Sequence, residues 1–243
     1  MFKASTFWDH IQELRSRIIK SLFGLAVGTG IALWQWERLW SWIARPVVAH
    51  HLPVTFIATS PMETMATSFR LSIIAGCILS FPWILWQVWS FLAPGLYVKE
   101  RRLFWGTFLS FIVMFVAGAA FAYFVVLPTG LAFLATYMHG VITQSWKQED
   151  FASFIVQFLL GFGLIFELPV AAFLLGRLGL VTPRGMWKFF RFAIVIIFVL
   201  AALLTPDPVS QLMMALPLCL LYILSIGVCS LARQREEGEE AGA

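Results

Sequence analysis

Six long apolar segments alternate with polar stretches along the chain. An apolar helix of about 20 residues, with a rise of ~1.5 Å per residue, crosses the ~30 Å hydrocarbon core of a bilayer. These segments are too continuously apolar for helices of a soluble protein, which keep one polar face. The pattern predicts an all-α, polytopic membrane protein with one six-helix domain over residues 1–231. We expect its spans at about 18–36, 65–91, 103–127, 153–178, 189–204 and 209–231.

Details within the segments predict how the helices pack and end. Gly24 and Gly28 lie about one turn apart and give the first span a small face that another helix can approach closely. The fifth span, at 189–204, would cover only ~24 Å as a helix. Either it thins the bilayer or its predicted boundaries are misplaced by a few residues. The polar, acidic tail at 232–243 is expected to be disordered.

Basic residues gather in alternate loops, which predicts the orientation of the protein. Thirteen of the 17 Lys and Arg residues lie on one side of the predicted spans, and the other side has only Arg38, Arg45, Arg70 and Lys147. Positively charged loops stay in the cytoplasm, so we expect both termini there. The pI near 9.2 reflects these flanking charges. The expected surroundings are therefore a lipid bilayer, and no nucleic-acid partner is expected.

The chain has 60% apolar and 12% charged residues and contains no motif of a common enzyme class. The patterns HExxH, GxSxG and the phosphate-binding loop are absent, and the four histidines lack ligand spacing. Cys77, Cys219 and Cys229 lie in or beside apolar runs, where cysteine behaves as a small hydrophobe. We therefore expect neither an enzyme nor a bound cofactor or metal.

Glu167 lies near the middle of the fourth predicted span, in FGLIFELPVAAFLL. A charge at the bilayer centre costs about 2.5–3.5 kcal/mol on insertion scales, so the carboxyl group must be protonated or must face protein or water. Gly161, Gly163 and Pro169 lie nearby and permit close approach or a bend. Two hypotheses remain: a neutral structural glutamate, or a polar contact for a substrate or partner inside the membrane.

Glu13 and Glu100 lie at the predicted cytoplasmic border, in HIQELRSR and LYVKERRL. Each has basic neighbours, and an ion pair with one of these at an exposed site would contribute little. The alternative is that the two carboxylates form a receptor for guanidinium groups, which carboxylates bind through paired hydrogen bonds.

A series of short motifs, taken together and in order, resembles the TatC family. TatC proteins are the polytopic receptors of the twin-arginine protein translocase, and the resemblance extends from His10 to about Gly227. The motifs are His10-Ile11-Gln12-Glu13-Leu14-Arg15, Ser60-Pro61-x-Glu63, Phe81-Pro82, Gln87-x-Trp89-x-Phe91-x-x-Pro94, Glu100-Arg101-Arg102, Phe121-Ala122-Tyr123-Phe124, Phe166-Glu167-x-Pro169 and Leu204-Thr205-Pro206-Asp207.

The resemblance implies a cupped six-helix bundle in a bacterial-type inner membrane. It implies binding of signal peptides with consecutive arginines, a multimeric complex with TatA/TatB-like single-span proteins, and transport of folded cargo driven by the proton-motive force. The signal-peptide residues that it implies are Glu13, Leu14, Arg15, Phe91, Pro94, Glu100 and Arg101. The implied intramembrane contacts are Glu167, Gln87 and Tyr123, and the implied extracytoplasmic positions are Pro46, Thr205, Asp207 and Gln211.

A different class of function remains as an alternative. A proton-coupled secondary transporter for a small solute would use Glu167 as its relay. Such transporters usually contain inverted repeats and broken helices, and the sequence has no convincing repeat between its halves. An intramembrane enzyme would need a paired nucleophile and base, which the sequence lacks.

Overall fold

The computed structural model describes residues 4–92, 101–137, 144–205 and 207–241, and side chains within 11–91, 105–137, 144–203, 205 and 207–232. Its elements, in chain order, are α1 (Ala4–Trp34), α2 (Trp36–Ala49), β1 (Val54–Ile57), α3 (Pro61–Leu92), α4 (Arg101–Phe121), the π-helical segment η3 (Ala122–Val126), α5 (Leu127–Thr136), β2 (Gln144–Lys147), α6 (Gln148–Ile165), α7 (Leu168–Arg177), α8 (Pro183–Leu204) and α9 (Pro208–Ala241).

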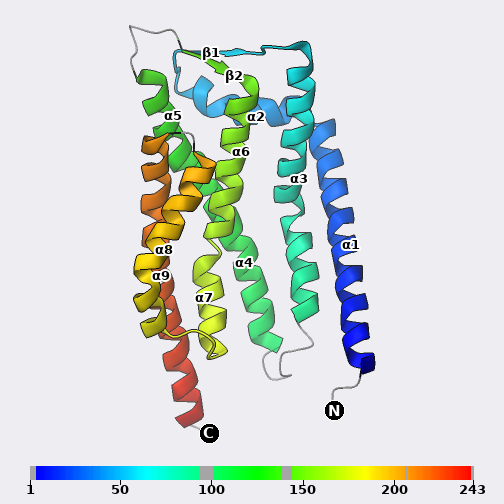
Figure 1. The fold of residues 1–243 in the computed structure, drawn as a ribbon, viewed down its shortest axis with the longest axis vertical. Coiled ribbons are helices and arrows are strands. Elements are labelled where there is room, and N and C mark those ends of the chain that lie inside the picture. Colours follow the sequence, from blue (N-terminus) through cyan, green and yellow to red (C-terminus); the bar gives the residue numbers. More distant parts are fainter. Residues whose placement is uncertain (1–3, 93–100, 138–143, 206, 242–243) are drawn as a thin grey trace.

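The long helices run side by side, and both termini lie at the same end of the bundle, which we call the terminus end (Figure 1). At the other end, α2 lies across the bundle beside β1 and β2, and we call these three elements the cap. Among the described residues, six segments are long and apolar enough to cross a membrane: 11–34, 61–91, 105–136, 148–177, 183–203 and 208–232. The predicted all-α fold with six spans is confirmed.

Helix α8 begins at Pro183, earlier than the expected start of the fifth span at residue 189. Its 22 residues cover ~33 Å, which matches an ordinary hydrocarbon core. The Thr182 hydroxyl begins this helix by accepting a hydrogen bond from the Gly185 N–H. The short fifth span thus results from a misplaced boundary. Helix α9 continues to Ala241, where the sequence predicts a disordered tail from residue 232.

The third span continues past Pro128 to Thr136, about three turns beyond its expected end. The helix widens to π geometry in η3, where the Leu127 N–H donates to the Ala122 carbonyl five residues back. Pro128 falls in the first turn of α5, a position where a proline causes little disturbance. The local π turn therefore lets the helix pass a residue that usually ends one.

The fourth span is broken between α6 and α7, at Phe166 and Glu167. Pro169 has no N–H, so the Ile165 carbonyl cannot receive its usual donor four residues on. The Glu167 N–H instead donates to Leu164, three residues back. The chain resumes as α7, in which Pro169 occupies the first turn. This break gives Glu167 its position.

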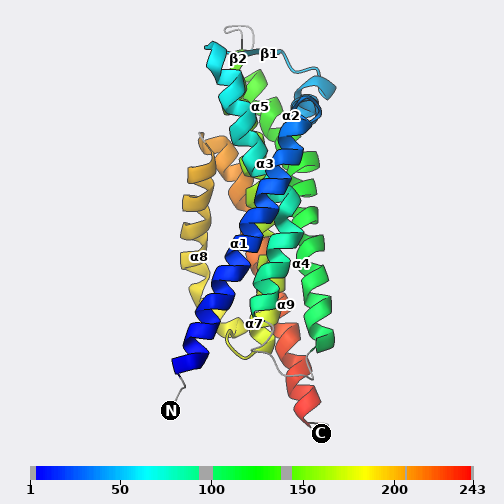
Figure 2. The same cartoon turned by 90° about the vertical axis from the view of Figure 1, so that its right-hand side faces the viewer.

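Close packing of α1 on α3 depends on glycine. A Cβ atom on Gly28 would lie 2.7 Å from the carbonyl oxygen of Gly76, so the two backbones touch. Gly24 likewise packs against the Trp83 ring. The predicted small face of the first span is confirmed, and Figure 2 shows α1 running along α3 at the outside of the bundle.

Two short strands that the sequence did not predict belong to the cap. β1 pairs in parallel with β2, with Val54 opposite Gln144 and Ile57 opposite Lys147. Beside this sheet, Arg70 of α3 forms a 2.9 Å ion pair with Glu149 of α6. Helix α6 itself lies at the centre of the bundle, and its side chains Ile155, Phe158 and Phe162 are almost fully buried. The cap thus connects α3 to the central helix.

Candidate functional site

Glu13 already binds a guanidinium group within the chain. An Nη2 hydrogen of Arg17, one turn further along α1, is donated to Glu13 Oε1 over 3.2 Å. The other terminal nitrogen of Arg17 donates to Gln87 Oε1 of α3 over 3.4 Å. The Glu13 side chain remains 36% exposed, so its second oxygen is accessible. These three residues form a polar site between α1 and α3, near the terminus end.

The other predicted signal-peptide residues lie around or beyond this group. Leu14 is 42% exposed and Arg15 is exposed, while Phe91 is half-buried near the end of α3. Pro94 and Glu100 lie outside the described residues, as does the side chain of Arg101. The pairing of Glu13 with Glu100 therefore remains a prediction.

The three residues expected to form an intramembrane contact do not lie together. Gln87 is only 2% exposed and binds Arg17, so it belongs with Glu13. Tyr123 contacts α2 at the cap instead. Glu167 lies alone in the break between α6 and α7. Arg17 was not among the predicted site residues, although its spacing of four residues from Glu13 is the usual signal of a helical ion pair.

Glu167 is buried without a partner. Its side chain is 9% exposed, and neither carboxyl oxygen has a hydrogen-bond partner among the described residues. The preceding residue, Phe166, packs against Phe121 and Phe162. An unpaired buried carboxyl group is costly, which favours a partner from another molecule or from water.

Pro46 and Tyr123 act on the same carbonyl group. Pro46 lies inside α2 and has no N–H, so the Trp42 carbonyl four residues back loses its helical donor. The Tyr123 hydroxyl donates to that oxygen over 2.8 Å. The rings of Trp42 and Tyr123 also stack, with centroids 4.1 Å apart. Through the Trp42 carbonyl, Pro46 is thus linked to η3, and its expected extracytoplasmic position remains a prediction.

Thr205, Asp207 and Gln211 gather at the turn between α8 and α9. The Thr205 hydroxyl donates to the Ala201 carbonyl, and Asp207 Oδ2 accepts the Ser210 N–H over 2.7 Å. Gln211 Nε2 donates to the Phe198 carbonyl. Asp207 thus caps the start of α9. Of these three contacts, the Gln211 hydrogen bond joins α9 to α8, and the other two stabilise the ends of the helices at the turn.

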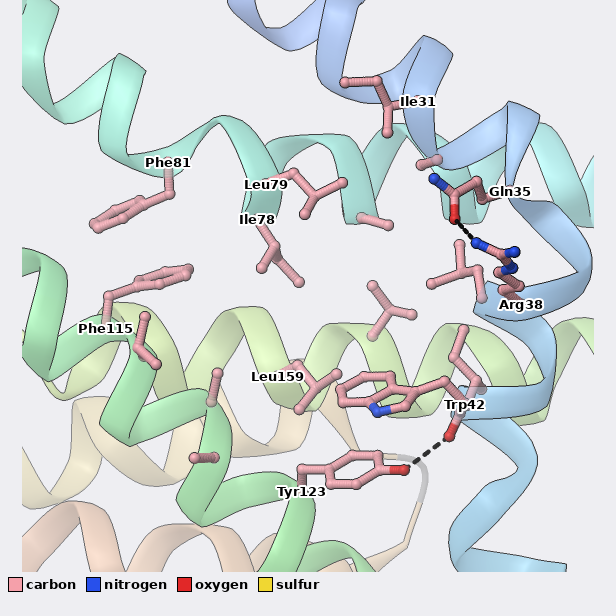
Figure 3. Close-up of a pocket in the computed structure, with 18 of the residues that line it drawn as sticks. Ile31, Gln35, Arg38, Trp42, Ile78, Leu79, Phe81, Phe115, Tyr123 and Leu159 are labelled. Atoms are coloured by element: carbon pink, nitrogen blue, oxygen red, sulfur yellow. Dashed lines mark hydrogen bonds between the residues drawn. The ribbon is translucent and has the colours of Figure 1, made fainter.

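An apolar cavity of about 770 Å³ lies between α1, α2 and α3 on one side and α4, η3 and α6 on the other. Figure 3 shows Trp42 and Tyr123 at one end and the facing rings of Phe81 and Phe115 at the other. At its edge lie two polar side chains, Gln35 just before α2 and Arg38 within α2, and Arg38 Nη1 donates a hydrogen bond to Gln35 Oε1 over 3.1 Å. Glu167 does not line this cavity.

A family model described as Sec-independent protein translocase protein (TatC) matches residues 9–217. This chain belongs to the TatC family. The TatC of Koribacter versatilis is 36% identical, over 98% of this chain and 92% of that protein. The TatC of Aquifex aeolicus is 35% identical, over 96% and 98%.

Solved structures of the family have the same fold. A crystal structure of the twin-arginine translocase receptor TatC is 36% identical and superposes with a TM-score of 0.86, over 92% of this chain and 99% of that one. A second, in DDM, has a TM-score of 0.84 at 35% identity. Because the chain belongs to this family and contains six apolar helices, it is a multi-pass membrane protein of a Sec-independent protein translocase.

Proposed function

We propose that this protein is the receptor subunit of a twin-arginine translocase. It binds signal peptides with consecutive arginines at the terminus end, which faces the cytoplasm. It then assembles with single-span partner proteins, and the proton-motive force drives passage of the folded cargo. The observation that carries this proposal is the Glu13 carboxylate, which holds the guanidinium of Arg17 in a family whose solved relatives are described as receptors.

The peptide would bind by bringing an arginine to the Glu13 carboxylate, which already holds the guanidinium group of Arg17. Arg17 uses only Oε1, so an incoming arginine can bind the free oxygen or replace Arg17. Gln87 can hold the displaced Arg17, because it already accepts a hydrogen bond from it. A second carboxylate, Glu100, would bind the second arginine. Lysine cannot form the same paired hydrogen bonds, so a Lys-Lys peptide should bind more weakly.

Assembly with partners would use Glu167. Its two oxygens lack partners among the described residues, at a break that leaves the Ile165 carbonyl without its helical donor. A polar or protonated group on a neighbouring transmembrane helix would satisfy both needs. Intramembrane polar residues of this kind face protein or water and mark functional contacts.

The proposal is tested by binding a labelled Arg-Arg signal peptide to the purified protein in nanodiscs. Glu13→Gln and Glu100→Gln should each weaken binding about tenfold to a hundredfold, the size of a charge-assisted hydrogen bond. Glu37→Gln is the matched control, because Glu37 is an exposed carboxylate on α2 at the other end. Unchanged binding by the Glu13 and Glu100 double variant would refute this site.

The role of Glu167 is tested separately, by co-purification of a single-span partner and by transport at equal protein levels. Glu167→Ala should reduce both, whereas Glu167→Gln, which keeps hydrogen-bonding capacity, should retain part of each. A fall in protein abundance with normal transport per molecule would make Glu167 a structural residue only.

A further inference from the structure

We propose that the apolar cavity beside the cap is a phospholipid-binding site. One acyl chain fills the cavity, and the phosphate of an anionic lipid lies between Arg38 and Arg45 of α2. This site is separate from Glu13 and Glu167, and it does not depend on the direction in which the protein is inserted.

The walls of the cavity favour an acyl chain. They are almost entirely aliphatic and aromatic, so water would find few hydrogen-bond partners inside. Several wall residues are strongly exposed, so the cavity is open to the outside of the bundle: Phe124 is 72%, Val116 59% and Leu79 58% exposed. In a membrane, that outside is lipid. A chain from the adjacent leaflet can therefore enter sideways without crossing water.

The depth of the cavity matches one leaflet. Its wall on α4 and η3 extends from Ile112 to Phe124, which is ~18 Å along a helix, slightly more than half of the ~30 Å hydrocarbon core. Towards the terminus end, Phe81 and Phe115 stack with centroids 3.7 Å apart and close it. A transmembrane helix of a partner protein would need a groove that continues past these two rings. An acyl chain from one leaflet is short enough to end at them.

Two arginines supply the head-group contacts. Arg38, Trp42 and Arg45 are spaced by four and three residues, so they share one face of α2. Arg38 lines the cavity edge and is oriented by Gln35, and Arg45 lies near enough to the Tyr123 hydroxyl to interact with it electrostatically. Both arginines are exposed, and neither forms an ion pair with a described carboxylate.

The orientation of α2 suits this role. The helix lies across the bundle at its end, as an interfacial helix lies along a membrane surface (Figure 1). Its tryptophans Trp36, Trp40 and Trp42 are the residue type that prefers the head-group region. The Trp42 ring lies at the end of the cavity nearest the cap (Figure 3). The phosphate layer and the two guanidinium groups therefore lie at the same depth, with the cavity directly below.

The test is native mass spectrometry of the purified protein after incubation with equal amounts of phosphatidylglycerol and phosphatidylcholine. Wild type should retain one phosphatidylglycerol. Arg38→Gln with Arg45→Gln should lower its retention about tenfold and remove the preference over phosphatidylcholine. Ala120→Phe, which fills the cavity, should lower retention of both lipids. The charge-matched control is Arg184→Gln with Lys188→Gln, on exposed positions of α8 at the terminus end, and it should behave as wild type.

Equal retention by all variants, or an equal loss in the α8 control, would mean that the lipid is bound non-specifically at the protein surface and would refute the proposal. Normal lipid retention by Ala120→Phe together with loss of a co-purifying single-span partner would assign the cavity to a helix instead. Binding of the Arg-Arg peptide is measured on the same samples. It should stay unchanged, so a failure of the lipid site is distinguishable from a failure of the receptor proposal.

Discussion

Two prolines inside helical segments leave backbone carbonyl groups without their usual helical donors. Pro46 removes the donor of the Trp42 carbonyl, and the Tyr123 hydroxyl replaces it from a position 81 residues away in the sequence. Pro169 frees a carbonyl in the same way, beside the unpaired Glu167. In the apolar interior of a bilayer bulk water is scarce, so each such group needs a partner within the protein, in a bound molecule or in an ordered water.

Tyr123→Phe should lower the free energy of unfolding by about 1 kcal/mol, because the Trp42 carbonyl loses its donor. In a Pro46→Ala background the loss should be smaller, since the alanine returns a helical N–H to that carbonyl. Thermal unfolding in detergent of the two single variants and the double variant measures this coupling. Tyr222→Phe, which removes a bond to Met186, is the control and should show no coupling with Pro46→Ala. Additive effects for Tyr123 would contradict the shared carbonyl.

Arg17→Gln should tighten binding of the Arg-Arg peptide by up to about fivefold, because it removes a cation that competes for Glu13 over an exposed ion pair. Peptide titration in nanodiscs measures the change, with Arg15→Gln as the neighbouring control. A loss of affinity in Arg17→Gln would show that Arg17 positions Glu13 for the peptide and does not compete with it.

At the scale of elements, the packing of α1 on α3 depends on backbone contact. The Gly28 and Gly76 backbones meet with no room for a side chain, and the Trp83 ring covers Gly24 while its N–H donates to the Lys20 carbonyl. The same pair of helices carries the polar site around Glu13. The spacing of that site is therefore set by how closely these two helices approach.

Gly28→Leu should destabilise the protein by about 1–3 kcal/mol and weaken peptide binding, because the new Cβ would overlap the Gly76 carbonyl and push the helices apart. Gly30→Leu is a matched control two residues along the same helix, where an added Cβ meets nothing within 4 Å. It should be neutral or slightly stabilising. Thermal unfolding compares the two variants, and equal effects would rule out the close contact as the cause.

At the scale of the whole molecule, the bundle has two chemically different ends. The terminus end holds Glu13 and the basic starts of α4 and α8. The cap end holds the small sheet, α2 and the Arg70–Glu149 ion pair. Between the two ends, the central helix α6 contacts α3, α4 and α8. Helix α7, which follows α6 in the chain, packs against α9. The proposed peptide site and the proposed lipid site thus lie at opposite ends of the bundle.

The orientation of the bundle is tested by thiol labelling of intact cells in a background with the three native cysteines replaced by alanine. Ser145→Cys, exposed on β2, should react with a membrane-impermeant reagent from outside. Arg184→Cys, exposed at the start of α8, should react only after the cells are opened. Both should react equally once the membrane is dissolved. The opposite labelling pattern would reverse the proposed orientation.

Several elements differ from their expected form because their geometry depends on distant residues. Pro128 predicts a helix end, yet a π turn absorbs it. β1 and β2 are too short to be recognised alone, and each is formed by pairing with the other across about 90 residues. Gln87 was expected to make an intramembrane contact, but the fold places Arg17 next to it, and Arg17 donates a hydrogen bond to its side chain. Helix boundaries and non-local pairings are what local pattern predicts least well.

The sequence by itself determined the number and class of the spans, the family resemblance and the unusual position of Glu167. These features follow from local composition, because the bilayer selects apolar helices one segment at a time. The tertiary structure alone decided that Gln87 joins Arg17 and Glu13, that Tyr123 serves the carbonyl freed by Pro46, and that a lipid-sized cavity lies under α2. The two hydrogen bonds join residues that lie 70 and 81 positions apart in the sequence, and only packing brings such residues together.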